Sequence, residues 1–164
     1  MAELTADRIR ELLSYNPITG ELTWIAKTSG RRKQGGKAGS KMKMGYLEIG
    51  IDGTSYLTHR VVWMIVHGHW PSDQIDHING IRDDNRLSNL REASNIINGQ
   101  NKRMARSDSK TKLLGSSWSI DNKKYLSQIV SAGKHYHLGY YKSPEEAHQA
   151  YLTAKRRLHA GCTI

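Results

Sequence analysis

The sequence predicts an α+β protein built from two small units. Residues 72–101 read as strand, turn, strand and helix in that order. Residues 113–164 read as three strands followed by one helix with a clear start signal. The chain has 164 residues, of which 37% are apolar and none is Phe. Because this composition offers few large apolar side chains, we do not expect one large core.

Composition limits the functional classes. Lys and Arg number 25 against 15 Asp and Glu, a net charge of +10, which favours a polyanion as the partner. The single cysteine, Cys162, excludes an internal disulfide framework and a Cys-rich zinc site. No apolar run approaches the roughly 18 residues of a membrane span, and the first residues lack the pattern of a signal peptide. We expect a soluble protein of a reducing, cytoplasmic compartment that has no membrane partner.

Local signals define the N-terminal elements. Thr5 is a suitable N-cap for a short helix whose apolar residues, Leu13 included, share one face. Residues 15–20 have turn chemistry and lead into an alternating strand over 21–25. Residues 28–43 combine basic side chains with Gly and Ser and contain no acid. We therefore expect a mobile basic loop there.

A hairpin and a buried helix are expected next. Strands over 46–51 and 55–58 are joined by Asp52-Gly53, which is a strong hairpin signal. Residues 59–67 read as a short buried helix that stops at Gly68.

The central segment combines short strands with a helix. Residues 75–78 have strand character, Asn79-Gly80 is a type I′ turn pair, and a second short strand or loop follows. Residues 92–101 look helical, with Ser94 or Asn95 near the start of the helix, and residues 102–112 form a polar, basic linker.

The C-terminal residues predict a small sheet with one helix. Strands are expected over 115–120, 125–132 and 134–141. The sequence Ser143-Pro144-Glu145-Glu146 then begins a helix, with Ser as N-cap, Pro at the first helical position and a capping box closed by Glu146.

Charge is distributed unevenly along the chain. Residues 1–70 carry ten basic and six acidic side chains, residues 71–98 three and five, and residues 99–164 twelve and four. An acidic segment repels phosphate unless a cation is bound there, so residues 71–98 are compatible with a divalent-metal site. The alternative is that their Asp residues shape turns and cap helices.

Hydrolytic chemistry is possible in this acidic segment. Cleavage of a phosphodiester needs a base for water and a cation near the leaving oxygen, and neutral imidazole can be that base. Carboxylate and amide oxygens can hold a hard divalent cation. Asp76 and His77 are followed by Asn89 and Asn98. Because neighbouring residues on a strand point to opposite faces, Asp76 and His77 can serve one site only if the strand end is distorted.

The spaced block resembles the HNH endonucleases with the ββα-metal fold, especially small freestanding and intron-encoded phage enzymes. The residues that carry the resemblance are Asp76-His77-Ile78-Asn79-Gly80, Asp84-Asn85-Arg86, Asn89-Leu90-Arg91, Asn95 and Asn98, with upstream likeness at Tyr15–Trp24, Gly45-Tyr46 and His59-Arg60.

The resemblance implies a role for each of four residues. His77 would be the general base, and Asp76 and Asn98 would be metal ligands. Asn89 would brace the loop and orient His77. Oxygen ligands favour one Mg²⁺ or Mn²⁺ ion over zinc or nickel.

Other polar groups have structural interpretations. Asp83, Asp84 and Asn85 are expected to shape and cap a turn rather than bind metal. For His59 a helix-start or core role is favoured over a supporting role at the site. The pairs His67/His69 and His135/His137 lack a third ligand at matching spacing, so we interpret them as surface or DNA-contacting residues.

The C-terminal segment resembles the plant ethylene-response-factor (Apetala-type) DNA-binding domain. The residues that carry this resemblance are Gly115, Trp118, Tyr125, Gln128-Ile129, Gly133-Lys134, Leu138-Gly139-Tyr140, Glu145-Glu146-Ala147 and Ala150-Tyr151. It implies a three-stranded sheet in the DNA major groove with a helix packed behind it. The family's arginine-rich first strand is Gly115-Ser116-Ser117-Trp118-Ser119 in this chain, so affinity is better supported than base specificity.

We therefore expect a metal-dependent HNH DNA endonuclease, a phage homing enzyme acting in the host bacterial cytoplasm. Its nuclease region would be 1–101 (ββα-metal motif about 72–101), followed by the linker 102–112 and a DNA-binding domain 113–164. The partner is double-stranded DNA, without a small-molecule cofactor, and a monomer is favoured over a dimer. Residues expected to contact DNA are Arg31, Arg32, Lys33, Lys37, Lys102, Arg103, Lys123, Lys124 and Lys134.

Two alternatives stay open from the sequence. One is a non-cleaving DNA-binding regulator with a degenerate HNH block, and the other is a basic structural or packaging protein. The presence of Asp76, His77 and Asn98 favours the nuclease. Because these residues precede the C-terminal domain, we expect deletion of 113–164 to leave the metal site intact.

Overall fold

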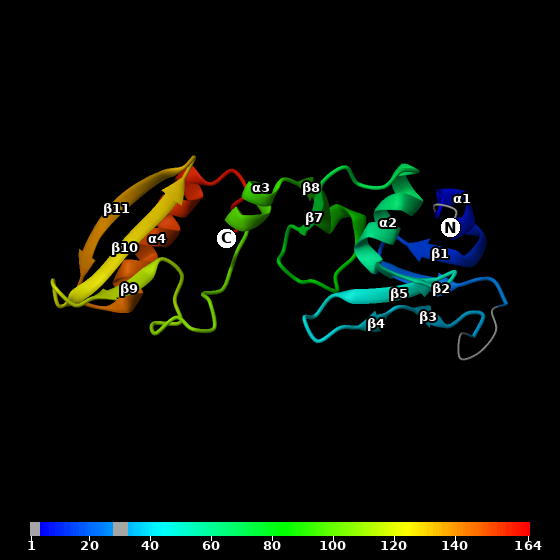
Figure 1. Cartoon of the computed structure of the whole chain (residues 1–164), viewed down its shortest axis with the longest axis horizontal. Coiled ribbons are helices and arrows are strands. Elements are labelled where there is room, and N and C mark those ends of the chain that lie inside the picture. The colour runs from blue at the N-terminus through cyan, green and yellow to red at the C-terminus, as the bar shows by residue number, and fades with distance from the viewer. Residues whose placement is uncertain (1–3, 28–32) are drawn as a thin grey trace. The chain divides into compact units, whose positions relative to one another are not determined.

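The computed structural model describes residues 4–27 and 33–164, and Figure 1 shows its helices and strands. Two compact units divide the chain between Ser94 and Asn95: unit 1 is residues 1–94 and unit 2 is residues 95–164. Helices and sheets occur in both, which agrees with the α+β class. The functional division expected from the sequence, at residues 101 and 113, stays a prediction.

Unit 1 begins with a capped helix that runs directly into a strand. Helix α1 is Ala6–Leu12, and the Thr5 hydroxyl accepts a hydrogen bond from the Arg8 amide at 3.2 Å. The sequence analysis included Leu13 in this helix, but Leu13 begins strand β1 (Leu13–Asn16). It pairs there with Trp24 of β2 (Glu21–Trp24).

The basic loop predicted over 28–43 is partly wrong. Within it the chain forms β3 (Lys37–Ala38) and β4 (Ser40–Lys41), which pair with β2 and β5. Ala38 is 1% exposed, whereas the lysines on either side of it along the chain point outward. The basic composition of this segment does not reveal its strand pairing, because ladder hydrogen bonds join backbone groups and form whatever the side chains are. Residues 28–32 lie outside the described residues.

The second hairpin and the helix after it confirm the sequence prediction. Strands β5 (Leu47–Ile51) and β6 (Thr54–Leu57) are joined by Asp52 and Gly53, with φ of 47° and 80°. Helix α2 (Thr58–His67) ends where Gly68 adopts the left-handed conformation.

The central segment is a two-stranded ladder with a long connection. Strand β7 (Gln74–His77) pairs with β8 (Leu90–Ala93), and the short 3₁₀ helix η1 (Leu87–Asn89) precedes β8. The predicted type I′ turn is wrong, because only Gly80 of the pair has a positive φ, and its amide bonds the His77 carbonyl at 2.8 Å. The predicted loop follows over residues 81–89, and Asn89 Oδ1 accepts a hydrogen bond from the backbone N–H of Asn79. Helix α3 (Asn95–Gln100) begins at one of the two residues predicted near its start, whereas Glu92 and Ala93, the first residues of the predicted segment, are held in the ladder.

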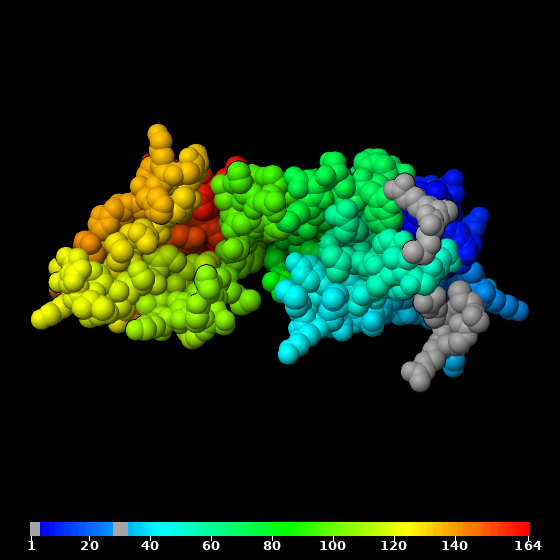
Figure 2. Space-filling model, in the orientation of Figure 1, coloured from blue at the N-terminus to red at the C-terminus, as the bar shows by residue number. Residues whose placement is uncertain are grey.

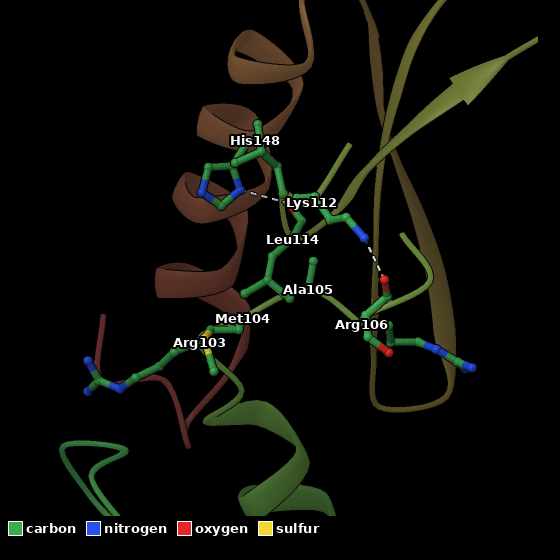
Figure 3. Close-up of a pocket in the computed structure, with 9 residues that line it drawn as sticks. Arg103, Met104, Ala105, Arg106, Lys112, Leu114 and His148 are labelled. Carbon is green, nitrogen blue, oxygen red and sulfur yellow. Dashed lines mark hydrogen bonds between the residues drawn. The ribbon is translucent and has the colours of Figure 1, made fainter. Parts of the chain in front are cut away.

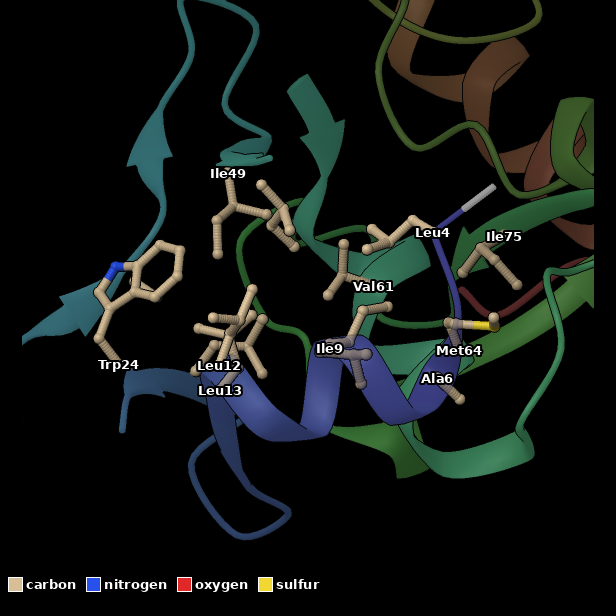
Figure 4. Close-up of a cluster of buried hydrophobic side chains, with 14 of the residues drawn as sticks. Leu4, Ala6, Ile9, Leu12, Leu13, Trp24, Ile49, Val61, Met64 and Ile75 are labelled. Atoms are coloured by element: carbon tan, nitrogen blue, oxygen red, sulfur yellow. The ribbon is translucent and has the colours of Figure 1, made fainter. Parts of the chain in front are cut away.

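The core of unit 1 lies where α1, α2 and the strands meet. Figure 4 shows apolar side chains from these elements converging on Ile9 and Val61, which are both fully buried. Further members are Leu4, Leu12, Leu13, Leu22, Trp24, Ile49, Ile51, Val62, Met64, Ile75 and Leu90. The N-terminal helix and hairpin are therefore part of the same packed body as the β7–β8 ladder.

Unit 2 contains a three-stranded antiparallel sheet with one helix. The strands β9 (Ser116–Ser119), β10 (Lys124–Ser131) and β11 (Lys134–Tyr141) lie in the order β11-β10-β9. Helix α4 (Pro144–Leu158) begins with the predicted capping box and packs against the sheet (Figure 1). Buried Ile129 and Ala147 lie on the strand and the helix that pack together. No helix among the described residues is long and apolar enough to span a membrane.

Candidate active site

His77 is the last residue of β7 and lies in a buried cluster of polar and aromatic groups. Its side chain is 4% exposed, and its Nε2 lies 2.9 Å from Asn85 Oδ1. The His59 ring meets it edge-on at 5.0 Å between centroids, and the Tyr46 ring lies at 5.9 Å. The guanidinium of Arg82 lies over Tyr46 at 5.0 Å.

The electrostatic setting keeps His77 neutral at pH 7. Burial lowers the pKa of His77, although the Asn85 hydrogen bond and the charges of Asp76 and Asp84 act in the opposite direction. A carbonyl oxygen can only accept, so Nε2 carries the proton and donates it to Asn85 Oδ1. The lone pair of the neutral ring is then on Nδ1. A neutral imidazole in one tautomer is the form that can take a proton from water.

Asp76 lies beside His77 on the strand and forms an ion pair across the ladder. Its Oδ2 accepts hydrogen bonds from Arg91 Nε at 3.0 Å and Nη2 at 2.8 Å. The two residues are direct partners in the β7–β8 register, which shows no shift up to the final pair of His77 with Leu90. Both side chains are nonetheless buried, and the charge of Asp76 acts on the His77 ring. That Asp76 and His77 serve one site stays a prediction.

The donor atoms suit a hard cation rather than zinc. No group of three or more His, Cys, Asp or Glu that could hold a metal occurs within residues 4–27 and 33–164. Asp76 offers a carboxylate, and the remaining candidates are amide oxygens. Mg²⁺ and Mn²⁺ accept one carboxylate together with neutral oxygens and water, so this donor set fits them.

Asn89 braces the loop between the strands through both ends of its side-chain amide. Its Oδ1 accepts from the Asn79 amide at 2.8 Å, and its Nδ2 donates to the Asp84 carbonyl at 2.7 Å. The residue that bonds the His77 ring is Asn85, which sequence analysis assigned to turn formation. The bracing role predicted for Asn89 describes these contacts, and its role in orienting His77 stays a prediction.

Most acids of the segment 71–98 have partners within unit 1. Asp83 pairs with Lys41 at 2.6 Å, and Asp84 pairs with Arg86 at 2.5 Å. The Arg86 hydrogen bond lowers the pKa of Asp84 to about 2. Glu92 accepts from the Ser72 amide. The contacts of Asp83 and Asp84 therefore agree with the interpretation that these residues shape the turn.

Two buried polar atoms next to His77 have no hydrogen-bond partner among the described residues. They are Nδ2 of Asn85 and Nδ1 of His59. Buried polar atoms are normally bonded to protein or ordered water, so a water molecule or ligand oxygen is expected beside them. His59 sits in the first turn of α2, in agreement with its expected structural position, yet it also forms one wall around His77.

Asn98, the other expected metal ligand, lies on α3 in unit 2. Asp76 lies in unit 1, so the role of Asn98 as a second metal ligand beside Asp76 stays a prediction. Within unit 2 the C-terminal residues hold the end of α3. The Gly161 amide donates to Gln100 Oε1 at 3.0 Å, and the Thr163 hydroxyl donates to Asn101 Oδ1. These contacts argue against the expectation that residues 113–164 can be deleted without affecting α3, the helix that carries Asn98.

The residues expected to contact DNA occupy several surfaces. Lys33, Lys102, Lys123, Lys124 and Lys134 are exposed, Lys37 pairs with Glu21, and Arg103 donates to the Thr163 hydroxyl at 2.6 Å. Figure 2 shows the β10 and β11 residues, yellow to orange, at the surface of unit 2. Arg31 and Arg32 lie outside the described residues. All these DNA contacts stay predictions.

Unit 2 contains a pocket that is lined by its own residues. It has a volume of about 280 Å³ and is lined by residues 103–107 and 112–114 together with His148. In Figure 3 the His148 ring points to the Leu114 carbonyl, 2.7 Å from Nδ1, and Lys112 reaches the Ser107 carbonyl. The other two charged lining residues, Arg103 and Arg106, bond the Thr163 hydroxyl and the Asp108 carboxylate.

Sequence reasoning missed the partners of both central residues. The bonds from Asn85 to His77 and from Arg91 to Asp76 join residues that are eight and fifteen positions apart. The available signal was that both partners belong to the spaced block on which the resemblance rests.

Comparison with known proteins gives a match over the segment that contains Asp76 and His77. Residues 56–100 match the HNH endonuclease family, a range that contains α2, β7, β8 and α3. Neither the curated proteins nor the solved structures gave a match. The similarity therefore suggests nuclease activity and a DNA substrate for this part of the chain.

Proposed function

We propose that the chain is a metal-dependent DNA endonuclease that hydrolyses phosphodiester bonds. The observation that carries this proposal is His77, which is neutral, buried and held in one tautomer by Asn85 within the segment similar to HNH endonucleases. A ring with its lone pair on Nδ1 is suited to take a proton from an attacking water.

Each residue of the candidate site has a distinct role in the proposed hydrolysis. His77 accepts the proton, and Asn85 keeps the opposite ring nitrogen protonated. Asp76 and Asn98 would hold Mg²⁺ or Mn²⁺, and Arg91 fixes the Asp76 carboxylate through Oδ2. When bound, such an ion stabilises negative charge on the phosphate and on the leaving oxygen.

The proposal extends to DNA binding and biological setting. The net charge of +10 supports binding of double-stranded DNA through phosphate contacts. The resemblance to freestanding and intron-encoded phage enzymes supports a homing role in the host cytoplasm. The resemblance of residues 113–164 to Apetala-type domains supports a DNA-binding role for that segment. One observation favours the alternative of a non-cleaving regulator: Arg91 already neutralises the carboxylate of Asp76.

A plasmid-cleavage assay tests the proposal. Supercoiled DNA should be nicked or linearised with Mg²⁺ or Mn²⁺ and remain intact with EDTA. His77→Ala should lower the rate by roughly 10²–10⁴-fold while DNA affinity, measured in EDTA, stays near the wild-type value. His67→Ala, at the exposed end of α2, is the control and should cleave normally. Cleavage by His77→Ala at the wild-type rate would refute the assignment, and binding without any cleavage by the wild type would support the regulator.

A further inference from the structure

The loop that presents Asn85 to His77 is held from behind by the β1–β2 hairpin. The Tyr15 hydroxyl donates to the Asn85 carbonyl at 3.1 Å and accepts from the Leu87 amide at 2.8 Å. One side chain, 70 residues earlier in the sequence, therefore bonds the backbone at Asn85 itself and two residues beyond it.

The turn of the same hairpin makes a second contact with this loop. Gly20 has a φ of +76°, and a Cβ at this position would lie 2.4 Å from Arg86 N and 2.7 Å from the Asn85 carbonyl carbon. No methyl group fits between these two stretches of backbone. The hairpin tip and the Asn85–Arg86 peptide are thus in direct contact.

The hairpin is a firm support because it belongs to the core of unit 1. Leu13 and Leu22, one on each of its strands, are almost completely buried. The Asn85 side chain is itself 1% exposed and has little room to adjust. A displacement of the Asn85 backbone is therefore transmitted to its Oδ1 and to the Nε2–H···O bond of His77.

We propose that Tyr15 and Gly20 are positioning residues for His77: the β1–β2 hairpin sets the place of Asn85, and Asn85 sets the orientation and tautomer of the base. The functional centre thus includes residues 13–24, which lie outside the matched segment 56–100. This inference rests on the proposed function, since it gives His77 the role of base.

Paired glycine variants test the steric contact. Gly20→Ala and Gly53→Ala both introduce a side chain at positive φ, +76° and +80°, but the Cβ at Gly53 has nothing within 4 Å. The two substitutions therefore share the same backbone strain, and only Gly20→Ala pushes on Asn85–Arg86. We expect Gly20→Ala to lower the single-turnover cleavage rate by about 10²-fold, with unchanged DNA affinity, and Gly53→Ala to remain close to wild type.

Paired tyrosine variants test the hydroxyl and avoid a folding defect. Tyr15→Phe removes both hydrogen bonds to the loop but keeps the ring, whereas Tyr56→Phe alters a ring stacked on Trp70. The ¹⁵N chemical shifts of the His77 ring, measured without metal or DNA, report its tautomer. We expect Tyr15→Phe to shift them towards a mixture of tautomers and to lower the cleavage rate, and Tyr56→Phe to change neither.

The outcomes separate this inference from the proposed function. If the wild type cleaves DNA but Gly20→Ala and Tyr15→Phe match their controls in rate and ring shifts, the positioning role is overturned and the nuclease stands. If the wild type does not cleave, the proposed function is overturned and the base role falls with it. Altered ring shifts together with a reduced rate in both variants support the inference.

Discussion

The buried imidazole of His59 predicts a pH-dependent stability that is large enough to measure. Its side chain is 4% exposed, and burial, followed by the charges of His77 and Arg60, lowers its pKa from 6.5 to about 3. Because the folded pKa is the lower one, the unfolded chain binds a proton below pH 6.5 that the folded chain does not bind. Stability is therefore greatest above pH 6.5 and falls as the pH decreases towards 3.

The magnitude follows from that difference in pKa. Each pH unit between the two values corresponds to about 1.4 kcal/mol, so lowering the pH from 7.5 to 5.0 should cost about 2 kcal/mol through His59. Since small domains are stable by roughly 5–15 kcal/mol, this loss is a substantial part of the total.

Urea unfolding of the full chain at the two pH values measures this effect, with Trp fluorescence as the signal. His59→Phe keeps an aromatic ring between Tyr46 and His77 but cannot titrate. The difference in unfolding free energy between pH 7.5 and 5.0 should be about 2 kcal/mol smaller in this variant than in wild type. His67→Phe is the control on the same helix and should retain the wild-type difference. An equal pH dependence in wild type and His59→Phe would refute the reasoning.

Three further predictions concern the metal, α3 and DNA. Asp76→Asn removes the carboxylate, so cleavage in Mg²⁺ should be lost while DNA affinity in EDTA is retained; a variant that still cleaves would exclude Asp76 as a ligand. Thr163→Val removes the hydroxyl that bonds Asn101 and Arg103 and should speed amide hydrogen exchange in α3, whereas Thr163→Ser should not; equal rates would show that this contact does not hold the helix. Lys134→Gln should reduce the slope of log affinity against log salt by about 0.9, and an unchanged slope would remove Lys134 from the phosphate contacts.

Turns and helix ends were predictable because their signals act within a few residues. Thr5 and Ser143 cap the helices that follow them, through hydrogen bonds to amides three residues away. Asp52-Gly53 closes a hairpin with positive φ at both residues. In each case the side chain and the backbone group that it satisfies lie in the same short segment, so no distant partner is needed.

Residues 90–93 show where this reasoning failed. Glu92 and Ala93 were included in the helical segment predicted over 92–101, but Glu92 pairs with Ile75 in the β7–β8 ladder. The loop predicted over 28–43 failed in the same way, since Ala38 pairs with Leu22. A strand obtains its backbone hydrogen bonds from another segment, and local composition does not record which segment is near.

The sequence by itself determined the α+β class, most helix ends and the chemistry that can occur around Asp76 and His77, because residue type and spacing fix these properties. Only the tertiary structure decided that Asn85 bonds the His77 ring, and that Tyr15 and Gly20 support Asn85. The physical reason is that a hydrogen bond of 2.9 Å depends on where folding places two atoms. That placement is set by the packing of a hairpin and a loop some 70 residues apart in the sequence.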